Sequence, residues 1–388
     1  MNADFHYYAT YCAAILAGFS HEESICISYS DNFVDSCTRT LLTRIDAPSA
    51  AATTQMSLEM MSARTDVVGI HDITRIWSSF HFLPKDLYAM PETHGSRKHH
   101  FSKAYLNKYR LICGPDSELV ELTVDLAKDK SLQAIGLAMH VLSDTWAHMN
   151  FAGTPSVVIN DIKDSYLYLV TDEGDIKPNF RHSASAPDDI DNLIFTRSLG
   201  GISENFIMSL GHGRAGHLPD YCFLRYRYLP AWGDYMEILK DNPSDYKHAF
   251  CQMITALKYL HGDSDGFTRG VYDFDAIKDI EDEIETILRK VQPDASEDWR
   301  KLGEKLSGCE IKPYDVEEYL SEYVEADEDK KDDTFIGKFI IAALAQKSMV
   351  TAQIYKSGNK LAGRSVDYSD KGFGGMKDFE KLIREDKS

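Results

Sequence analysis

The sequence predicts a mainly α-helical fold with a sizeable core. Apolar residues recur at helical spacing in four segments, 7–17, 132–151, 246–260 and 335–355. One short apolar run, 165–170, lies among polar loops and leaves room for a few strands or none. With 388 residues, 43% of them hydrophobic, the chain is long enough for one large domain or for one domain with an extension.

The first helical segments carry histidine and aspartate. Asp4 and His6 open the first segment, Asp31 and Asp35 lie one helical turn apart on the next, and His81 follows between two phenylalanines. Each has a simpler alternative: a capping or surface histidine for His6, a solvated helix face for the two aspartates, and a buried core histidine for His81. Histidines and aspartates that recur in this way nevertheless favour one distributed site.

The segment 132–151 carries the clearest chemical pattern. His140, Asp144 and His148 are spaced four residues apart, so on a helix they stay within an arc of roughly 80°. Imidazole and carboxylate are the ligands of hydrolytic zinc sites, and a carboxylate between two histidines can bridge two metal ions. The alternative is an intrahelical His–Asp pair beside an unrelated histidine.

A second histidine-rich stretch follows the polar loops. His212, His217 and Asp220 lie among glycines and a proline, and an aromatic-rich run, 221–232, comes directly after them. These aromatic residues could line a cleft, contact lipid or enclose a quaternary ammonium head group. Ordinary core packing is the alternative for the same residues.

The C-terminal part of the chain is charged and helical in pattern. Residues 279–290 are amphipathic, and the acidic stretch 316–333 is most simply a solvated helix face or a linker. After Tyr355 the sequence turns to glycine, serine and lysine, which favours a loosely held tail. We expect a metal-dependent hydrolase core at 1–265 and a helical C-terminal region at 266–388.

The charge and cysteine content exclude some classes of function and of cysteine site. The chain has 61 acidic and 42 basic residues and a net charge of −19, which disfavours general nucleic-acid binding. Bound divalent cations would make a carboxylate-rich cleft electropositive even so. The seven cysteines form no C-x-x-C pair, so we expect reduced, mostly buried thiols.

The sequence also carries expectations about location. Its first residues show no basic start followed by an apolar stretch, so we expect no cleavable secretory signal. No run of about 18 apolar residues suggests a transmembrane segment. We therefore expect synthesis in the cytoplasm, with any secretion by a leaderless route.

The order of the histidine and aspartate segments resembles the zinc-dependent phospholipase C and S1/P1 nuclease superfamily. The stretch 3–8 looks like the first-helix motif of that superfamily, 80–86 looks like its His-Phe-x-x-Pro-Asp stretch, and the His-x-x-x-Asp of 140–144 matches its most diagnostic element. The chain is most similar to the bacterial, Pseudomonas/Legionella-type phosphatidylcholine-hydrolysing phospholipase C group. The resemblance implies a helical fold that holds up to three zinc ions in a cleft.

The resemblance also implies the ligands of the first two ions. The central ion would be bound by His140, Asp144, His81 and an aspartate of 31–35, for which we prefer Asp35. Asp144 would also bridge to a second ion held by His6. Well-known members use the amino group and carbonyl of an N-terminal tryptophan, which this sequence lacks at its start, and we expect Asp4 to substitute.

The third ion would be bound by His148, His212 and Asp220, with His217 as an alternative. Here the chain departs from the family, which has a longer gap after the bridging aspartate and uses a His-x-x-x-Glu pair. Asp35 or Asp31 would accept the proton of the attacking water.

The implied activity is a phospholipase C that cleaves phosphatidylcholine-type lipids at a membrane surface to diacylglycerol and a phosphorylated head group. Two alternatives stay open: a single-strand nuclease of the same superfamily and a noncatalytic metal-binding helical protein.

Overall fold

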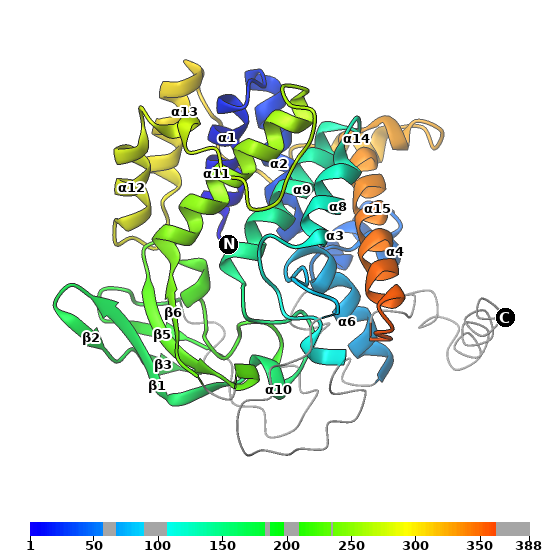
Figure 1. Ribbon diagram of the computed structural model, residues 1–388. Helices are drawn as coiled ribbons and strands as arrows, with labels where there is room; N and C mark the ends of the chain where they lie inside the picture. Colours follow the sequence, from blue (N-terminus) through cyan, green and yellow to red (C-terminus); the bar gives the residue numbers. More distant parts are fainter. Residues whose placement is uncertain (57–66, 89–106, 183–186, 198–208, 234–235, 362–388) are drawn as a thin grey trace.

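The protein is mainly α-helical, as the sequence predicts. A layer of packed helices forms most of the molecule, and a small sheet lies at one end, away from the C-terminal helix α15 (Figure 1). The computed structural model describes residues 1–56, 67–88, 107–182, 187–197, 209–233 and 236–361.

The helices fall into three successive sets along the chain. The N-terminal set comprises η1 (Asp4–Ala9), α1 (Thr10–Leu16), α2 (His21–Ser36), α3 (Arg39–Arg44), α4 (Ser49–Ala52) and α6 (Val67–Phe80). The central set comprises α8 (Glu118–Ala127), α9 (Leu132–Ala147), α10 (Val157–Asn160), the short η3 (Leu218–Asp220) and η4 (Ala231–Gly233), and α11 (Asn242–His261). The C-terminal set comprises η5 (Asp275–Ile277), α12 (Glu281–Arg289), α13 (Ser296–Ser307), α14 (Leu320–Glu325), η6 (Lys331–Asp333) and α15 (Phe335–Lys356).

Helix α9 is the centre of the helical layer. Helices α2, α8, α11 and α15 all pack against it, and every residue from Ile135 to Ala147 is buried. A Cβ atom on Gly136 would lie 2.1 Å from the Ile27 carbonyl oxygen of α2, so this glycine lets the two backbones meet. The Ser131 side chain accepts a hydrogen bond from the Ala134 amide and caps the start of the helix.

The four predicted helical segments are present, but α9 ends earlier than expected. Its last residue is Ala147, His148 is the C-cap, and Asn150 has a φ of 76°. A residue in this left-handed region turns the chain out of the helix. The short segment after His148 therefore runs towards the sheet instead of continuing α9.

The sheet supports one side of the helical layer. It is antiparallel in the order β2 (Gly174–Ile176), β1 (Ile162–Thr171), β5 (Arg225–Pro230) and β6 (Ile238–Asp241). A second, two-stranded sheet pairs β3 (Asn179–Arg181) in parallel with β4 (Ile194–Thr196).

The aromatic run after Asp220 contributes mainly to the core. Burial alternates along β5, and Tyr226 and Tyr228 are fully buried in a cluster with Phe82 and Phe151. The ring of Tyr228 stacks on Phe151 with their centroids 5.9 Å apart. For these two tyrosines, core packing is therefore the correct alternative.

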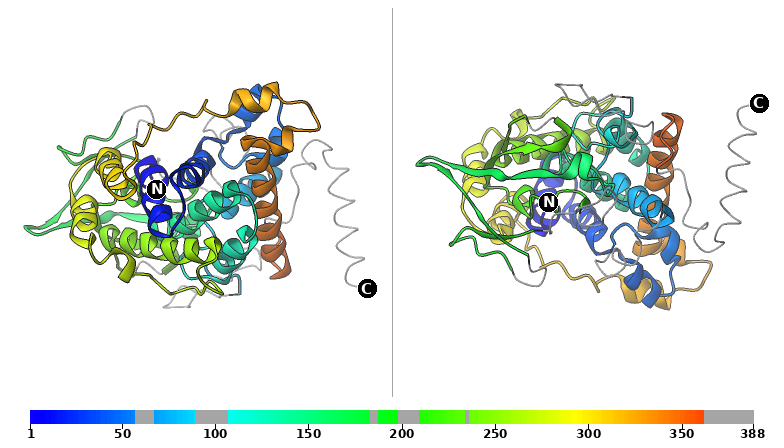
Figure 2. Two further views of the ribbon diagram at one scale, coloured as in Figure 1. Left: turned by 90° about the horizontal axis from the view of Figure 1, so that it is seen from above. Right: turned by 90° about the horizontal axis from the view of Figure 1, so that it is seen from below.

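The C-terminal helices pack on the same core as the N-terminal ones. Helix α15 contacts α6, α8 and α9, and α13 covers η1 and α1; Figure 2 shows α1 enclosed by its neighbours. One cluster of buried apolar side chains extends from Met1 to Ile354. The region after 265 is helical as expected and shares this core. The expected tail lies largely outside the described residues, which end at 361.

Two further expectations can be compared with the structure. All seven cysteines are free, and five are buried. Helix α15 is long and apolar enough to cross a membrane. Its most apolar 18 residues have a mean hydropathy of 1.3, and half of them are buried inside the protein. In this structure it packs as a core helix.

Candidate metal centre

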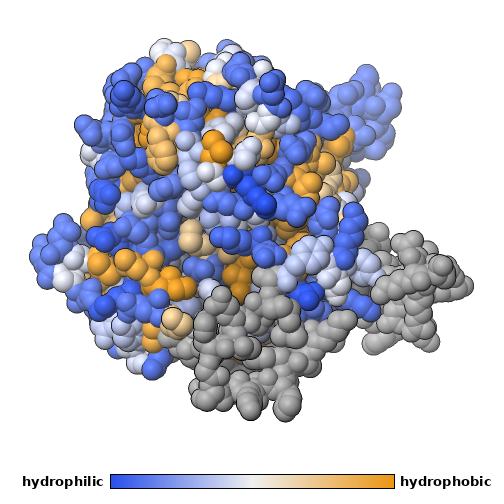
Figure 3. Space-filling view, viewed as in Figure 1, coloured by the Kyte–Doolittle hydropathy of each residue, from blue (hydrophilic) through white to orange (hydrophobic). Residues whose placement is uncertain are grey.

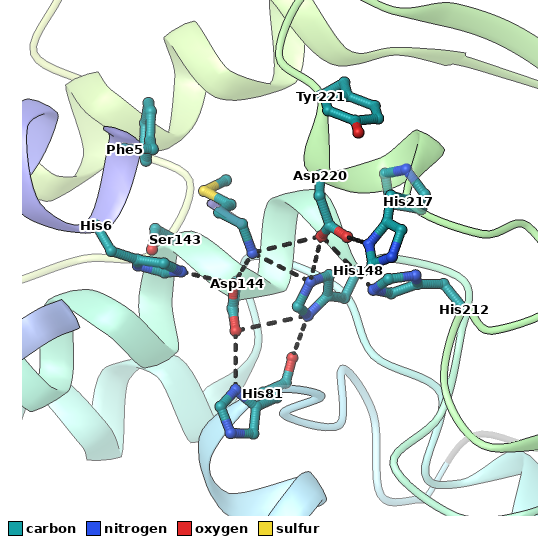
Figure 4. A network of polar contacts seen from close by, with 12 residues as sticks. Phe5, His6, His81, Ser143, Asp144, His148, His212, His217, Asp220 and Tyr221 are labelled. Atoms are coloured by element: carbon teal, nitrogen blue, oxygen red, sulfur yellow. Dashed lines mark hydrogen bonds and ion pairs between the residues drawn. The ribbon is translucent and has the colours of Figure 1, made fainter. Parts of the chain in front are cut away.

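Three groups of histidine and aspartate gather where η1, α2, α9, η3 and the segments after α6 and before η3 converge. Figure 4 shows the part of this region around Asp144 and Asp220. Within each group, the ligand atoms lie within 4.8 Å of one another. The first group is His6, His140 and Asp144, the second is Asp35, His81 and His140, and the third is His148, His212 and Asp220.

Asp144 joins the groups through its two carboxylate oxygens. Oδ1 lies 3.3 Å from His6 Nε2. Oδ2 lies 3.2 Å from His140 Nε2 and 3.3 Å from His81 Nδ1. The two oxygens thus face different histidines, the arrangement that a bridging carboxylate needs.

Three of the five histidines in the groups hold one ring nitrogen against a backbone carbonyl. His81 Nε2 lies 3.0 Å from the Thr54 carbonyl, His148 Nδ1 lies 2.7 Å from the His81 carbonyl, and His212 Nδ1 lies 2.8 Å from the Gly216 carbonyl. A histidine that donates one N–H outwards presents the lone pair of its other nitrogen inwards, as metal-binding histidines do.

Asp31 lies behind the groups and orients two imidazoles. Its Oδ1 is 2.7 Å from His6 Nδ1 and 3.2 Å from His140 Nδ1, and its Oδ2 accepts a hydrogen bond of 2.6 Å from the Thr10 hydroxyl. The side chain is fully buried. Both oxygens of Asp31 are therefore engaged on the outer side of the histidines, away from a position where it could act on water.

Both ring nitrogens of His6 are buried in the first group. It lies on η1, a π-helical turn, which is a wider winding often found at functional sites. Both ring nitrogens are buried, and neither makes a hydrogen bond of good geometry within the described residues. Nδ1 faces the Asp31 carboxylate and Nε2 faces the Asp144 carboxylate, so a cation bound at Nε2 would take the place of a poorly aligned contact.

The α-amino group of Met1 also enters the centre. Its nitrogen lies 2.7 Å from Asp144 Oδ1, 3.2 Å from His148 Nε2 and 3.6 Å from Asp220 Oδ1. Burial lowers its pKa, but Asp144, Asp220 and Asp35 outweigh burial and raise the value to about 11. A cation thus stands between the first and third groups, at a point where carboxylate and imidazole converge.

The spacing of several donors is compatible with a four-coordinate metal ion. Ligand atoms at about 2.0–2.1 Å from a tetrahedral ion are about 3.3–3.4 Å apart. The distances from Asp144 to His6, His81 and His140 are 3.2–3.3 Å, and His148 Nε2 lies 3.3 Å from Asp220 Oδ1. Nitrogen and carboxylate oxygen donors without sulfur are also the set that hydrolytic zinc sites use.

The charges of the groups are strongly coupled. Burial alone would raise the pKa of Asp144, but His148, the Met1 amino group and His140 hold it well below its usual range. Burial would lower the pKa of His140, but Asp144, Asp31 and Asp35 raise it to about 10. The centre therefore holds its carboxylates ionised in a buried place, which favours cation binding.

Asp35 is the most open member of the three groups. Its side chain is 34% exposed, and it lies 3.6 Å from His81 Nδ1 and 4.0 Å from His140 Nε2. The amide of Gln55 donates a hydrogen bond of 3.2 Å to its Oδ1. Burial raises its pKa, but His140, His6 and His81 lower it below the ordinary value. Water can thus reach the centre at an ionised carboxylate.

The structure separates two predicted residues from the three groups. The Asp4 carboxylate accepts backbone hydrogen bonds from Phe5 and Ala295, at 2.8 and 2.9 Å, and belongs to none of the groups. The described contacts of the Met1 amino group include Asp144, whereas those of the Asp4 carboxylate do not. His217 lies on the outer side of Asp220, with its Nδ1 3.2 Å from Oδ2 and its side chain 59% exposed.

Sequence reasoning missed Met1 because its donor is a backbone amine, and residue type gives no signal for such a group. The only hint was the superfamily resemblance, whose members use an N-terminal amino group. The other predicted ligands, from His6 to Asp220, are brought together in one place.

Comparison with known proteins gives a family and no assigned activity. No curated protein and no solved structure matches the chain. A family described as "Family of unknown function (DUF6765)" matches residues 1–354, which include every residue of the three groups. The chain therefore belongs to the DUF6765 family.

Proposed function

We propose that this protein is a zinc-dependent phosphodiester hydrolase, and specifically a phospholipase C acting on phosphatidylcholine-type lipids. One observation carries the proposal: three donor groups adjoin one another, and Asp144 directs one oxygen to each of the first two. A purely structural metal site is closed and needs only one such group, whereas neighbouring sites that share a carboxylate are typical of phosphodiester hydrolysis.

The proposal gives each donor group a role. His6, Asp144, His140 and His81 would hold the two adjacent ions, and His148, His212 and Asp220 the third. Zinc supplies Lewis acidity towards a phosphoryl oxygen and lowers the pKa of water to near 7. The Met1 amino group would lose its proton to act as a donor.

Asp35 is the residue that we assign to proton transfer. It is an ionised carboxylate at the open edge of the second group, within 4.0 Å of His140 and His6. It can accept a proton from water at that edge, and Gln55 holds its carboxylate in place. Asp31 cannot take this role, because both of its oxygens are engaged behind the imidazoles.

The proposal is tested by metal content and hydrolysis together. We expect purified protein to contain two to three zinc ions and to release phosphocholine from phosphatidylcholine vesicles, with activity abolished by a chelator and restored by Zn²⁺. Asp144→Asn should lose at least one ion and the activity. Asp35→Asn, which keeps every imidazole, should retain at least the third group's ion and lower kcat by about 10²–10⁴-fold.

Parallel substrates separate the alternatives. Degradation of single-stranded DNA with intact lipid would favour a nuclease of the same superfamily, against which the net charge of −19 argues. Zinc that raises the melting temperature while both substrates survive would replace the enzyme proposal with a noncatalytic metal-binding protein. His261→Ala, at an exposed histidine that pairs with Asp263 outside the groups, is a matched control for nonspecific effects of histidine loss.

A further inference from the structure

A second concave site lies on the helical layer, outside the metal centre. It is a groove of about 400 Å³ between α8, α9 and α15. Its walls are mainly apolar and include Leu126, Leu137 and Ile341, and Ile341 is 49% exposed. Figure 3 shows apolar side chains gathered beside α15 on this face. The volume lies within the range of about 300–1,000 Å³ that small-molecule sites occupy.

Among the described residues that line the groove, the one side-chain amide already has hydrogen-bond partners within the protein. Gln346 lines it, but its amide donates hydrogen bonds to the Ser79 carbonyl and the Thr123 hydroxyl, at 3.2 and 3.0 Å. Its amide hydrogens are therefore already used within the protein. The groove offers an apolar surface along its length, which suits an apolar ligand segment.

Two lysines supply the charge. Lys130 follows α8 and Lys338 lies near the start of α15; both line the groove, and both are exposed. Within the described part of the chain, neither has a hydrogen-bonded or ion-paired side-chain partner. In a protein with a net charge of −19, two lysines without an ion-pair partner among the described residues, beside one apolar groove, offer a place for a single negative charge.

We propose that this groove binds a free fatty acid, with the acyl chain against Leu126, Leu137 and Ile341 and the carboxylate near Lys130 and Lys338. Charge complementarity carries the choice of occupant, because an acyl chain alone leaves both ammonium groups unused and a small anion leaves the apolar walls wet. The site is separate from the metal donors, so the inference does not depend on the proposed hydrolysis.

Displacement of a fluorescent probe tests the proposal on the full chain. Protein is loaded with 11-(dansylamino)undecanoic acid in chelator, and dodecanoate or 1-dodecanol is added. We expect both to displace the probe from one site, dodecanoate more strongly. Lys130→Gln with Lys338→Gln should weaken dodecanoate by about five- to tenfold and leave the alcohol unchanged.

Two variants of α15 locate the binding. Ala345→Trp places an indole in the groove and should abolish binding of both ligands, whereas Ser348→Trp, at an exposed position outside the lining, should bind as wild type does. Absence of probe binding, equal affinity for acid and alcohol, or unchanged binding by Ala345→Trp would overturn the proposal. So would binding that appears only when residues 362–388 are removed, because that segment would then be the occupant.

Discussion

At the scale of single residues, the orientation of the histidines in the candidate metal centre depends on residues that are not themselves in the three groups. Thr10 donates to Asp31, and Asp31 in turn lies against the outer nitrogens of His6 and His140. The hydroxyl of Thr10 thus fixes a carboxylate, and the carboxylate fixes which nitrogen of each imidazole faces inwards. Such outer contacts govern metal affinity as strongly as some ligands do.

Replacing Thr10 tests this chain of contacts. Thr10→Val keeps the shape of the side chain but leaves Asp31 Oδ2 without its 2.6 Å hydrogen bond in a fully buried place. We expect zinc affinity to fall by about 10- to 100-fold, measured by competition with a chromogenic chelator. Thr10→Ser retains the hydroxyl and should restore the affinity. Equal affinities for the valine and serine variants would contradict the role of Asp31.

A buried lysine gives a pH dependence of stability. Burial, together with the positive charge of Arg75, lowers the pKa of Lys347 from 10.5 to about 7. Between these two pKa values the unfolded chain binds a proton that the folded protein does not, so this group makes stability rise with pH. The destabilising effect of Lys347 is therefore largest at and below pH 7, and it disappears as the pH rises to 10.5.

Lys347→Met should therefore make the free energy of unfolding depend less on pH. From pH 7 to pH 9, the free energy of unfolding of wild type should rise by about 2 kcal/mol more than that of the variant. Urea unfolding at pH 7, 8 and 9 measures the difference. Lys338→Met, on the exposed face of the same helix, is the matched control. Parallel pH profiles for wild type and Lys347→Met would refute the lowered pKa.

At the scale of elements, the distance between α2 and α9 sets the geometry of the centre. Gly136 lies one helical turn before His140, and a Cβ there would also lie 2.7 Å from the Ser30 Cβ and 3.0 Å from the Asp31 amide nitrogen. The close approach is what brings Asp31 of one helix against His140 of the other. Any separation of the helices opens that contact.

Gly136→Ala should accordingly harm both stability and metal binding. Alanine favours a helix by about 1 kcal/mol over glycine, but overpacking against a backbone oxygen costs typically 1–3 kcal/mol. We expect a net loss in the free energy of unfolding and a lower zinc content, measured by denaturation and metal analysis. Gly266→Ala, where a Cβ meets nothing within 4 Å, should change neither.

The helices also show which features could be predicted from the sequence and which could not. Helical periodicity predicted α9 and α15 because a buried helix needs apolar residues at regular spacing. It could not predict that α9 ends at Ala147, since that depends on the left-handed Asn150. Histidine and aspartate spacing predicted which side chains gather. It could not assign Asp31 to the outer side, because that follows from the packing of α2 on α9.

At the scale of the whole molecule, the centre joins segments that are far apart in the chain. The three groups draw on positions from His6 to Asp220, and their buried carboxylates repel one another unless cations lie between them. A ligand that binds only the folded state stabilises it by mass action. Metal occupancy should therefore govern the stability of the entire fold.

Removal of zinc tests this coupling. Free zinc at about 100 times its dissociation constant should add about 2.7 kcal/mol to the stability of the metal-free protein. The melting temperature should fall in excess chelator and recover with zinc. Asp144→Asn should reduce that difference, since it removes charge from the carboxylate that faces two groups. Identical melting temperatures with chelator and with zinc would show that the centre binds no stabilising metal.

The hydrogen bond between Asp4 and the amide of Ala295 has a consequence for biosynthesis. The two residues are separated by 291 positions. At about 5–20 residues per second, ribosomes need roughly 15–60 s to make that stretch. During this interval the Asp4 carboxylate lacks the Ala295 amide, although η1 can already pack against α1 and α2. The contact that fixes the start of η1, two residues before His6, is therefore among the last to form in each new molecule.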